Sequence, residues 1–193
     1  MKTIELIQAG SNLLRKKNIK TYILDSELLL SKTLNKSREK ILINLDTKVD
    51  KKKINIFKEY LNRRTKNEPI AYILEEKEFW SKKFKVNKDT LIPRPETELL
   101  VDELLKIYKD KKISILDIGT GSGCIIISLI NSLKHSLGTG IDISKKAILV
   151  AKNNAEKHKI HNRIKFFNKS FENIFDKKFD LIVSNPPYID KKD

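Results

Sequence analysis

Residues 113–123 read Ile-Ser-Ile-Leu-Asp-Ile-Gly-Thr-Gly-Ser-Gly, and this stretch decides the fold. The apolar run Ile113–Ile118 predicts a buried strand, and a helix around Ile125–Leu133 is expected after the turn. Glycines between a strand and a helix permit a tight turn and the close approach of a ligand to the backbone. Their spacing is G-x-G-x-G, unlike the dinucleotide pattern, and the Lys-Ser/Thr ending of a P-loop is absent. By itself the turn could serve a dinucleotide, S-adenosylmethionine or only a sharp bend.

Strands and helices alternate along the rest of the second half of the chain. Further strands are predicted at Thr139–Ile143, Ile164–Phe167 and Asp180–Val183, and a helix at Ala147–Lys157. Such alternation is typical of a parallel sheet with helices on both faces. The expected fold class of this part is therefore α/β.

The first 70 or so residues predict a bundle of helices, because apolar residues recur at helical spacing. Asp25 is a plausible cap for the second helix and Ser37 for a short third one. After Asn67-Glu68-Pro69, a β-hairpin is expected with Ser81-Lys82-Lys83 at its turn. Pro95 then suits the first turn of a helix that runs roughly to Tyr108.

Composition narrows the classes of protein. The net charge is +15. The chain has a single cysteine, Cys124, which excludes a disulfide framework and a cysteine-based metal site. Cys124 is expected to be a buried apolar residue. No signal peptide and no apolar stretch near the ~20 residues of a membrane helix is found, so a cytoplasmic protein is expected. The basic first half indicates either an RNA surface nearby or a lysine-rich composition, and both remain open.

Asp142 strengthens the case for a nucleoside ligand. It lies at the end of the second predicted strand, 19 residues after Gly123. There a carboxylate can accept hydrogen bonds from both ribose hydroxyls. The alternative is a turn aspartate that caps the next helix.

The run Asn185-Pro186-Pro187-Tyr188 follows the last predicted strand. A planar amide or aromatic amino group is a poor nucleophile because its lone pair is delocalised. The oxygen of Asn185 can accept one of its hydrogens, the carbonyl of Pro186 the other, and Tyr188 can stack on its plane. The nitrogen lone pair is then aimed at an electrophile such as a sulfonium methyl group, and catalysis is mainly positioning. The alternative is a proline-rich turn with Asn185 as a cap.

The three histidines, His135, His158 and His161, are expected at the surface.

The sequence resembles the bacterial release-factor N5-glutamine methyltransferases (HemK/PrmC family) over its whole length. The matching segments are Pro69–Ile73, Glu78–Trp80, Leu91–Glu98, Asp117–Gly123 and Asn185–Tyr188. The resemblance implies a helical substrate-recognition domain (1–70), a β-hairpin connector (71–95) and a Rossmann-like class I S-adenosylmethionine-dependent methyltransferase domain (96–193). It also implies methylation of the glutamine in the Gly-Gly-Gln motif of peptide-chain release factors, with no metal, no membrane and no sequence-specific nucleic acid as partner.

The resemblance further implies roles for single residues. Those implied to bind S-adenosylmethionine are Gly119, Thr120, Gly121, Ser122, Gly123, Asp142, Phe171 and Asn185. Those implied to grip the substrate amide are Asn185, Pro186, Pro187 and Tyr188, of which Asn185, Pro186 and Tyr188 are catalytic. The sequence departs from the family at Ser170-Phe171, where an acidic residue is common before the aromatic, and at Glu75, where glycine is common.

Three other functions remain open at this point: glutamine methylation of a ribosomal protein, adenine-N6 methylation of DNA on a flipped base, and an inactive fragment. Only four strands are predicted, and the fourth carries the tetrapeptide. We therefore expect the methyltransferase domain (96–193) to be incomplete and the 193-residue chain to be inactive by itself.

Overall fold

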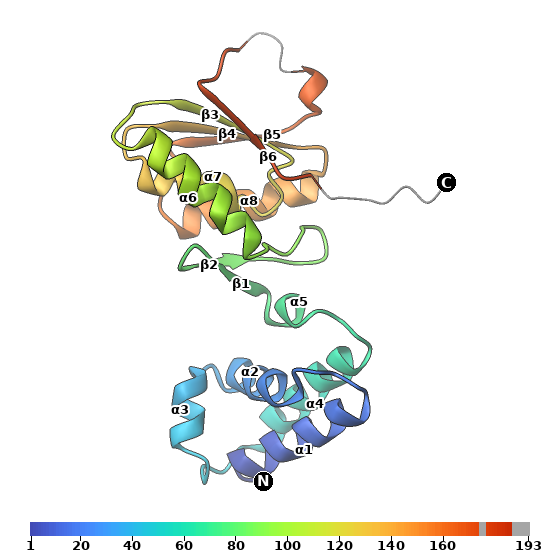
Figure 1. The fold of residues 1–193 in the computed structure, drawn as a ribbon. Helices are drawn as coiled ribbons and strands as arrows, with labels where there is room; N and C mark the ends of the chain where they lie inside the picture. Colours follow the sequence, from blue (N-terminus) through green and yellow to red (C-terminus); the bar gives the residue numbers. More distant parts are fainter. Residues whose placement is uncertain (174–176, 187–193) are drawn as a thin grey trace. The chain divides into compact units, whose positions relative to one another are not determined.

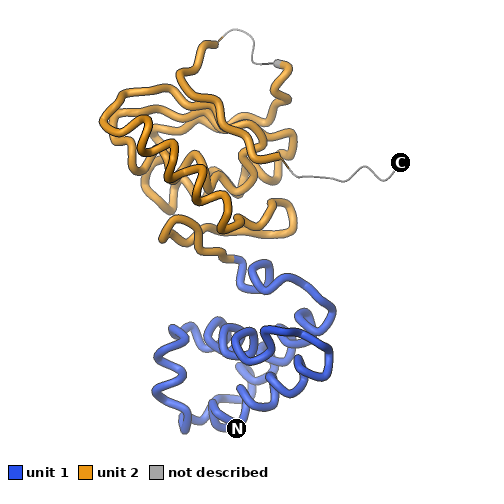
Figure 2. The backbone as a smooth tube through the Cα atoms, in the orientation of Figure 1, with its two compact units in different colours: residues 1–75 blue, residues 76–193 orange. Residues whose placement is uncertain are grey.

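The structure, a computed structural model, describes residues 1–173 and 177–186. The chain divides into two compact units, residues 1–75 and residues 76–193 (Figure 2). Each unit has its own hydrophobic core. The finer division at residues 70 and 95, with a recognition role for the first part, stays a prediction.

Unit 1 is helical, as predicted. Its helices are α1 (Thr3–Lys16), α2 (Tyr22–Leu34), α3 (Arg38–Ile43), α4 (Lys51–Thr65) and α5 (Ile70–Leu74). Leu14, Leu29, Leu30 and Phe57 are almost fully buried at its centre. The periodicity of the apolar residues therefore reports the buried faces of these helices. The short helix α5 was not predicted.

Two capping predictions have different outcomes. Ser37 caps α3, since its hydroxyl accepts a hydrogen bond from the backbone N–H of Lys40 at 3.4 Å. The prediction for Asp25 is wrong, because α2 begins at Tyr22 after Thr21. Asp25 instead is buried and accepts a hydrogen bond from Nε of Arg64 at 2.7 Å. A carboxylate away from water needs such a partner, and the pair joins α2 to α4.

A β-hairpin opens unit 2, with β1 (Glu76–Phe79) antiparallel to β2 (Lys82–Lys85). The hairpin prediction is confirmed, but the turn is shorter and earlier than predicted, because Lys82 and Lys83 belong to β2. Trp80 and Ser81 form the turn, both with positive φ. This register buries Phe79 and Phe84, whose rings meet edge to face at 6.1 Å between centroids.

The rest of unit 2 is a parallel sheet with helices. The strands are β3 (Ser114–Ile118), β4 (Leu137–Asp142), β5 (Ile164–Asn168) and β6 (Leu181–Ser184), in the spatial order β5-β4-β3-β6. The helices are α6 (Glu96–Tyr108), α7 (Cys124–Ser132), α8 (Lys145–Lys157) and the 3₁₀ turn η1 (Phe171–Asn173). Every strand and long helix predicted in this part is confirmed, with ends that differ by one or two residues.

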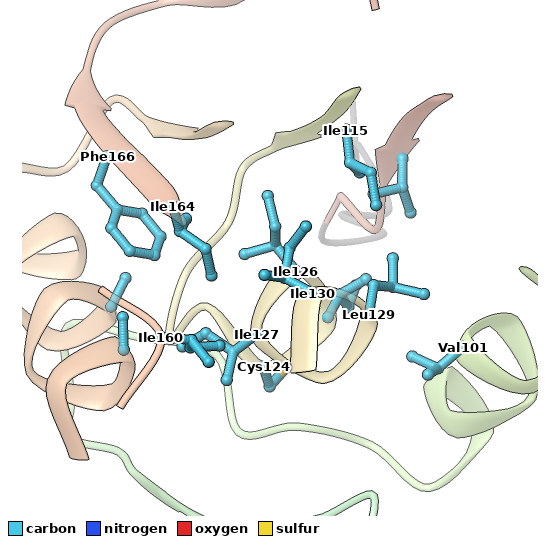
Figure 3. Packing of buried hydrophobic residues seen from close by; sticks show 14 of the residues in the cluster. Val101, Ile115, Cys124, Ile126, Ile127, Leu129, Ile130, Ile160, Ile164 and Phe166 are labelled. Carbon is cyan, nitrogen blue, oxygen red and sulfur yellow. The ribbon is translucent and has the colours of Figure 1, made fainter. Parts of the chain in front are cut away.

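Helix α7 is the centre of this core (Figure 3). All residues from Cys124 to Ile130 are buried, so this part of α7 has no exposed face and packs against the sheet, α6 and α8. Cys124 is buried, as expected for an apolar packing residue, and burial raises the pKa of its thiol to about 12.

The prediction of helices on both faces of the sheet is not met among the described residues. Helices α6, α7 and α8 all lie on one face (Figure 1). This is the face of Ile115, Ile164, Phe166 and Val183. On the other face the side chain of Ile182 stays 59% exposed. The carboxyl ends of the four described strands meet at one edge, and open α/β sheets bind their ligands at this edge.

Candidate cofactor and acceptor site

The glycine turn has a conformation that only glycine adopts easily. Gly119, Gly121 and Gly123 have φ of 70°, 54° and 78°. A Cβ atom at Gly119 would meet nothing within 4 Å, whereas one at Gly123 would lie 3.0 Å from Ile127 and 3.2 Å from Ala151. Gly123 therefore allows close packing of the turn on α7 and α8. Gly119 leaves open space beside the backbone, as a bound ligand would require.

Hydrogen bonds anchor the turn to the sheet. The backbone N–H of Thr120 donates to the carbonyl of Ile141 at 2.9 Å, and its hydroxyl donates to Oδ2 of Asp117 at 2.6 Å. The backbone N–H of Gly121 donates to Oδ2 of Asp142 at 3.0 Å. The turn is thus tied to the ends of both β3 and β4.

Asp142 has two backbone partners. Besides Gly121, its carboxylate accepts a hydrogen bond at Oδ1 from the backbone N–H of Ser144 at 2.8 Å. Ser144 caps α8, so Asp142 supports the start of that helix. This agrees in part with the alternative interpretation from the sequence, in which Asp142 itself caps the next helix. An ionised carboxylate can accept about four hydrogen bonds, so capacity for ribose hydroxyls is left.

Asp117 is a buried carboxyl under the turn, 1% exposed. Burial raises its pKa to about 7, against the opposing hydrogen bond from Thr120, and the nearby charge of Asp142 raises it further. Its Oδ1 has no hydrogen-bond partner in the described part of the chain. The protonated form is favoured below neutral pH because an uncompensated buried charge is costly.

Asn154 is a residue that the sequence analysis treated only as part of a helical stripe. It is fully buried on α8. Its Nδ2 donates to the carbonyl of Ser122 at 2.9 Å and to that of Lys85 at 3.0 Å. Its Oδ1 accepts from the backbone N–H of Lys85 at 2.7 Å. Asn154 therefore connects the glycine turn to the hairpin; the signal that could have found it is a polar residue on an otherwise apolar helix face.

Strand β6 is attached to β3 at both ends. At its start, Oδ2 of Asp180 accepts hydrogen bonds from the backbone N–H and the hydroxyl of Ser114, each at 2.7 Å. At its end, the hydroxyl of Ser184 donates to the carbonyl of Ile118 at 3.0 Å. Ser184 pairs with Ile118 in the parallel register. Asn185 and Gly119 consequently leave neighbouring strands at the same edge.

The side chain of Asn185 has a partner far away in the sequence. Its Nδ2 donates to Oγ1 of Thr97, in the first turn of α6, at 3.0 Å. Pro186 is exposed next to it. Pro187 and Tyr188 lie outside the described residues. The structure therefore brings together the glycine turn, Asp142 and Asn185, and it adds Thr97, which the sequence analysis noted only as part of the segment Leu91–Glu98.

Two further ring side chains, Phe171 and His158, were singled out from the sequence. Phe171 lies on η1 after β5 and is 59% exposed. The prediction that His158 lies at the surface is wrong: it is half-buried and its ring packs on Phe84 at 4.8 Å between centroids. Burial and the charges of Lys157 and Lys82 lower the pKa of His158.

Within residues 1–173 and 177–186, no three His, Cys, Asp or Glu side chains gather as a metal site would need. Over the same residues, no helix combines the length and apolar character needed to cross a membrane.

A parallel sheet with a glycine turn, an acidic residue on the next strand and an Asn-Pro-Pro segment defines a methyltransferase-type α/β domain. Comparison with known families agrees: residues 95–193 match the methyltransferase small domain, and residues 5–74 match the PrmC N-terminal domain. The chain belongs to the release factor glutamine methyltransferase family.

The relatives include a release factor glutamine methyltransferase of Haemophilus influenzae, 41% identical over 97% of this chain and 68% of its own length. A bifunctional methyltransferase of Rickettsia conorii is 40% identical over 96% of this chain and 40% of its own length. The chain thus spans about two fifths of the bifunctional relatives. A solved ribosomal protein L11 methylase from Lactobacillus delbrueckii is 29% identical, over 48% of this chain and 47% of its own, with a TM-score of 0.42.

Proposed function

We propose that this protein transfers a methyl group from S-adenosylmethionine to the side-chain amide nitrogen of the glutamine in the Gly-Gly-Gln motif of peptide-chain release factors. The observation that carries the proposal is the place of Asn185, next to the glycine turn at the carboxyl edge of the sheet. The family of the chain supports the same substrate. Because release factors act in translation, we propose a cytoplasmic location.

The residues fit the proposed cofactor. The left-handed turn leaves space beside Gly119, and the carboxylate of Asp142 has acceptor capacity for ribose hydroxyls. When bound, S-adenosylmethionine supplies a methyl group activated by the positive sulfur. We assign its binding to Gly119, Thr120, Gly121, Ser122, Gly123 and Asp142, with Phe171 as a stacking surface for the adenine and Asn185 near the methyl group.

The protein's task in this reaction is to orient the acceptor. Oδ1 of Asn185 and the carbonyl of Pro186 would accept the two hydrogens of the glutamine amide, and Tyr188 would stack on its plane. Held in this way, the amide nitrogen would face the methyl group that the cofactor would supply, and the proton that the nitrogen gives up would leave to water. Positioning of this kind accounts for large rate effects without a strong base.

The test is mass spectrometry of a release factor incubated with S-adenosylmethionine and this chain extended with the C-terminal region of the Haemophilus influenzae relative, carrying either the wild-type sequence or Asn185→Ala. We expect methylation of the Gly-Gly-Gln glutamine by the wild type and a rate lower by about a hundredfold or more in the variant. Asn153→Ala, an exposed asparagine on α8, is the matched control and should not change the rate. A normal rate in Asn185→Ala contradicts the proposal, as does methylation of a ribosomal protein or of DNA in place of the release factor.

That residues 1–193 are incomplete and inactive by themselves stays a prediction. It is tested by running the same assay on this chain and on a version extended with the C-terminal region of the Haemophilus influenzae relative. Equal rates for the two proteins would show the prediction to be wrong.

A further inference from the structure

Thr97 and Asn185 are 88 residues apart in sequence and joined by one hydrogen bond, from Nδ2 of Asn185 to Oγ1 of Thr97 at 3.0 Å. Thr97 lies in the segment Leu91–Glu98, to which the sequence analysis gave no chemical role. Nothing in the assignment of cofactor or acceptor residues uses this side chain. The bond nevertheless ends on the side chain that we place against the acceptor amide.

The two ends of an asparagine side chain are chemically opposite, since its oxygen accepts hydrogen bonds and its nitrogen donates them. The acceptor amide of the substrate presents two N–H groups. If the side chain of Asn185 were rotated by half a turn, its own N–H groups would face those of the substrate. A partner that accepts from Nδ2 on one side therefore selects the orientation in which Oδ1 is presented on the other.

Thr97 is held firmly enough to act in this way. The backbone N–H of Thr97 donates to the carbonyl of Arg94 at 3.1 Å, which closes the turn that begins α6. The carboxylate of Glu98 accepts from the backbone N–H of Trp80 at 3.0 Å, and Val101 is fully buried in the core. The start of α6 is thus fixed to the hairpin and to the core, so the hydroxyl of Thr97 has a defined place.

We propose that Thr97 is a positioning residue for methyl transfer: its hydroxyl holds Nδ2 of Asn185 so that Oδ1 is presented to the glutamine amide. The proposal rests on the function proposed above and adds a residue to the same site. It gives the segment Leu91–Glu98 a role at the same site as the Asn-Pro-Pro-Tyr tetrapeptide, because Thr97 of that segment supports the side chain of Asn185.

The kinetic test is made in the extended protein described above. It compares Thr97→Val, which keeps the shape without the hydroxyl, with Thr97→Ser, which keeps the hydroxyl. We expect kcat of Thr97→Val to fall about threefold to tenfold, the effect of one lost hydrogen bond, with little change in KM for the release factor or in cofactor affinity. Thr97→Ser should stay within about twofold of wild type. In an Asn185→Ala background, Thr97→Val should have no further effect because the two side chains act as one unit.

A second arm needs no activity. In ¹⁵N-labelled protein, the side-chain NH₂ signals of Asn185 are identified by their loss in Asn185→Ala. We expect these signals to shift and to exchange faster with solvent in Thr97→Val, but not in Thr97→Ser. Unchanged signals in Thr97→Val would overturn the inference, and so would an unchanged kcat in an active enzyme. A wild type that binds the cofactor but does not methylate a release factor would contradict the proposed function, while the NMR arm would still decide whether Thr97 orients Asn185.

Discussion

The carboxylate of Asp142 accepts a hydrogen bond from the backbone N–H of Gly121 at 3.0 Å. This bond joins the end of β4 to the middle of the glycine turn. The other carboxylate oxygen accepts from Ser144 at the start of α8. Asp142 therefore shapes the turn before any ligand arrives, and its replacement should affect both the turn and the bound ribose.

We predict that Asp142→Ala weakens S-adenosylmethionine binding by about 1–3 kcal/mol, because charge-assisted hydrogen bonds to the ribose are lost. Isothermal titration calorimetry measures this directly. Asp142→Asn keeps one acceptor oxygen and should weaken binding less. Unchanged affinity in Asp142→Ala would remove Asp142 from the cofactor site and leave it only a structural role.

We predict that Asn154→Ala lowers the free energy of unfolding by about 2–4 kcal/mol. The change leaves the carbonyl of Ser122 and both backbone groups of Lys85 without their buried partner. Urea denaturation followed by circular dichroism gives the value. The neighbouring Asn153 is exposed, so Asn153→Ala should change stability by no more than about 0.5 kcal/mol. Equal effects of the two variants would mean that the network at Asn154 contributes little.

We predict that Asp117 makes stability depend on pH. Its pKa is about 7 in the folded protein against an ordinary value of 3.8, so the folded state keeps a proton that the unfolded chain releases. The stabilising effect is complete below about pH 4 and is lost as the pH rises to 7, by up to about 4 kcal/mol.

Asp117→Asn cannot ionise and should remove this dependence. Compared with wild type, its relative stability should therefore increase from pH 4 to pH 7 in denaturation curves. The exposed Glu156→Gln controls for the loss of one negative charge. A constant difference between Asp117→Asn and wild type across this range would show that Asp117 is ionised throughout.

We predict that Glu75→Gly raises the free energy of unfolding by about 0.5–1 kcal/mol. Glu75 ends α5 in the left-handed conformation, with φ of 58°, which costs little for glycine and more for other residues. The ion pair with Lys32, at 3.8 Å on a 63% exposed side chain, is too weak to offset this gain. Glu75→Ala, which loses the ion pair but keeps a Cβ atom, should not be stabilised. A lower melting temperature for Glu75→Gly than for wild type would contradict the prediction.

The turn and helix-cap features could be predicted from the sequence, because each depends on residues only a few positions apart in the chain. The glycines of the turn need positive φ. The hydroxyl of Ser37 caps α3 through a hydrogen bond to Lys40, only three residues further along the chain. The glycine that is common in the family at position 75 suits a left-handed backbone, and the structure has that backbone with glutamate there. Asp25 was misread because a short acidic residue before an apolar run serves equally as a cap or as a buried partner, and only Arg64, 39 residues away, distinguishes the two.

The sequence by itself determined the helical first part and the α/β second part, the order of the strands and longer helices, the glycine turn and the family of the chain. These features follow from the periodicity of apolar residues and from short motifs, both of which depend on residues that are close together in the sequence. The tertiary structure alone decided that all three long helices of unit 2 cover one face of the sheet, that Asn154 connects the turn to the hairpin, and that Thr97 holds Asn185. The physical reason is that a hydrogen bond between groups tens of residues apart depends on how strands register and helices pack, which no local pattern records.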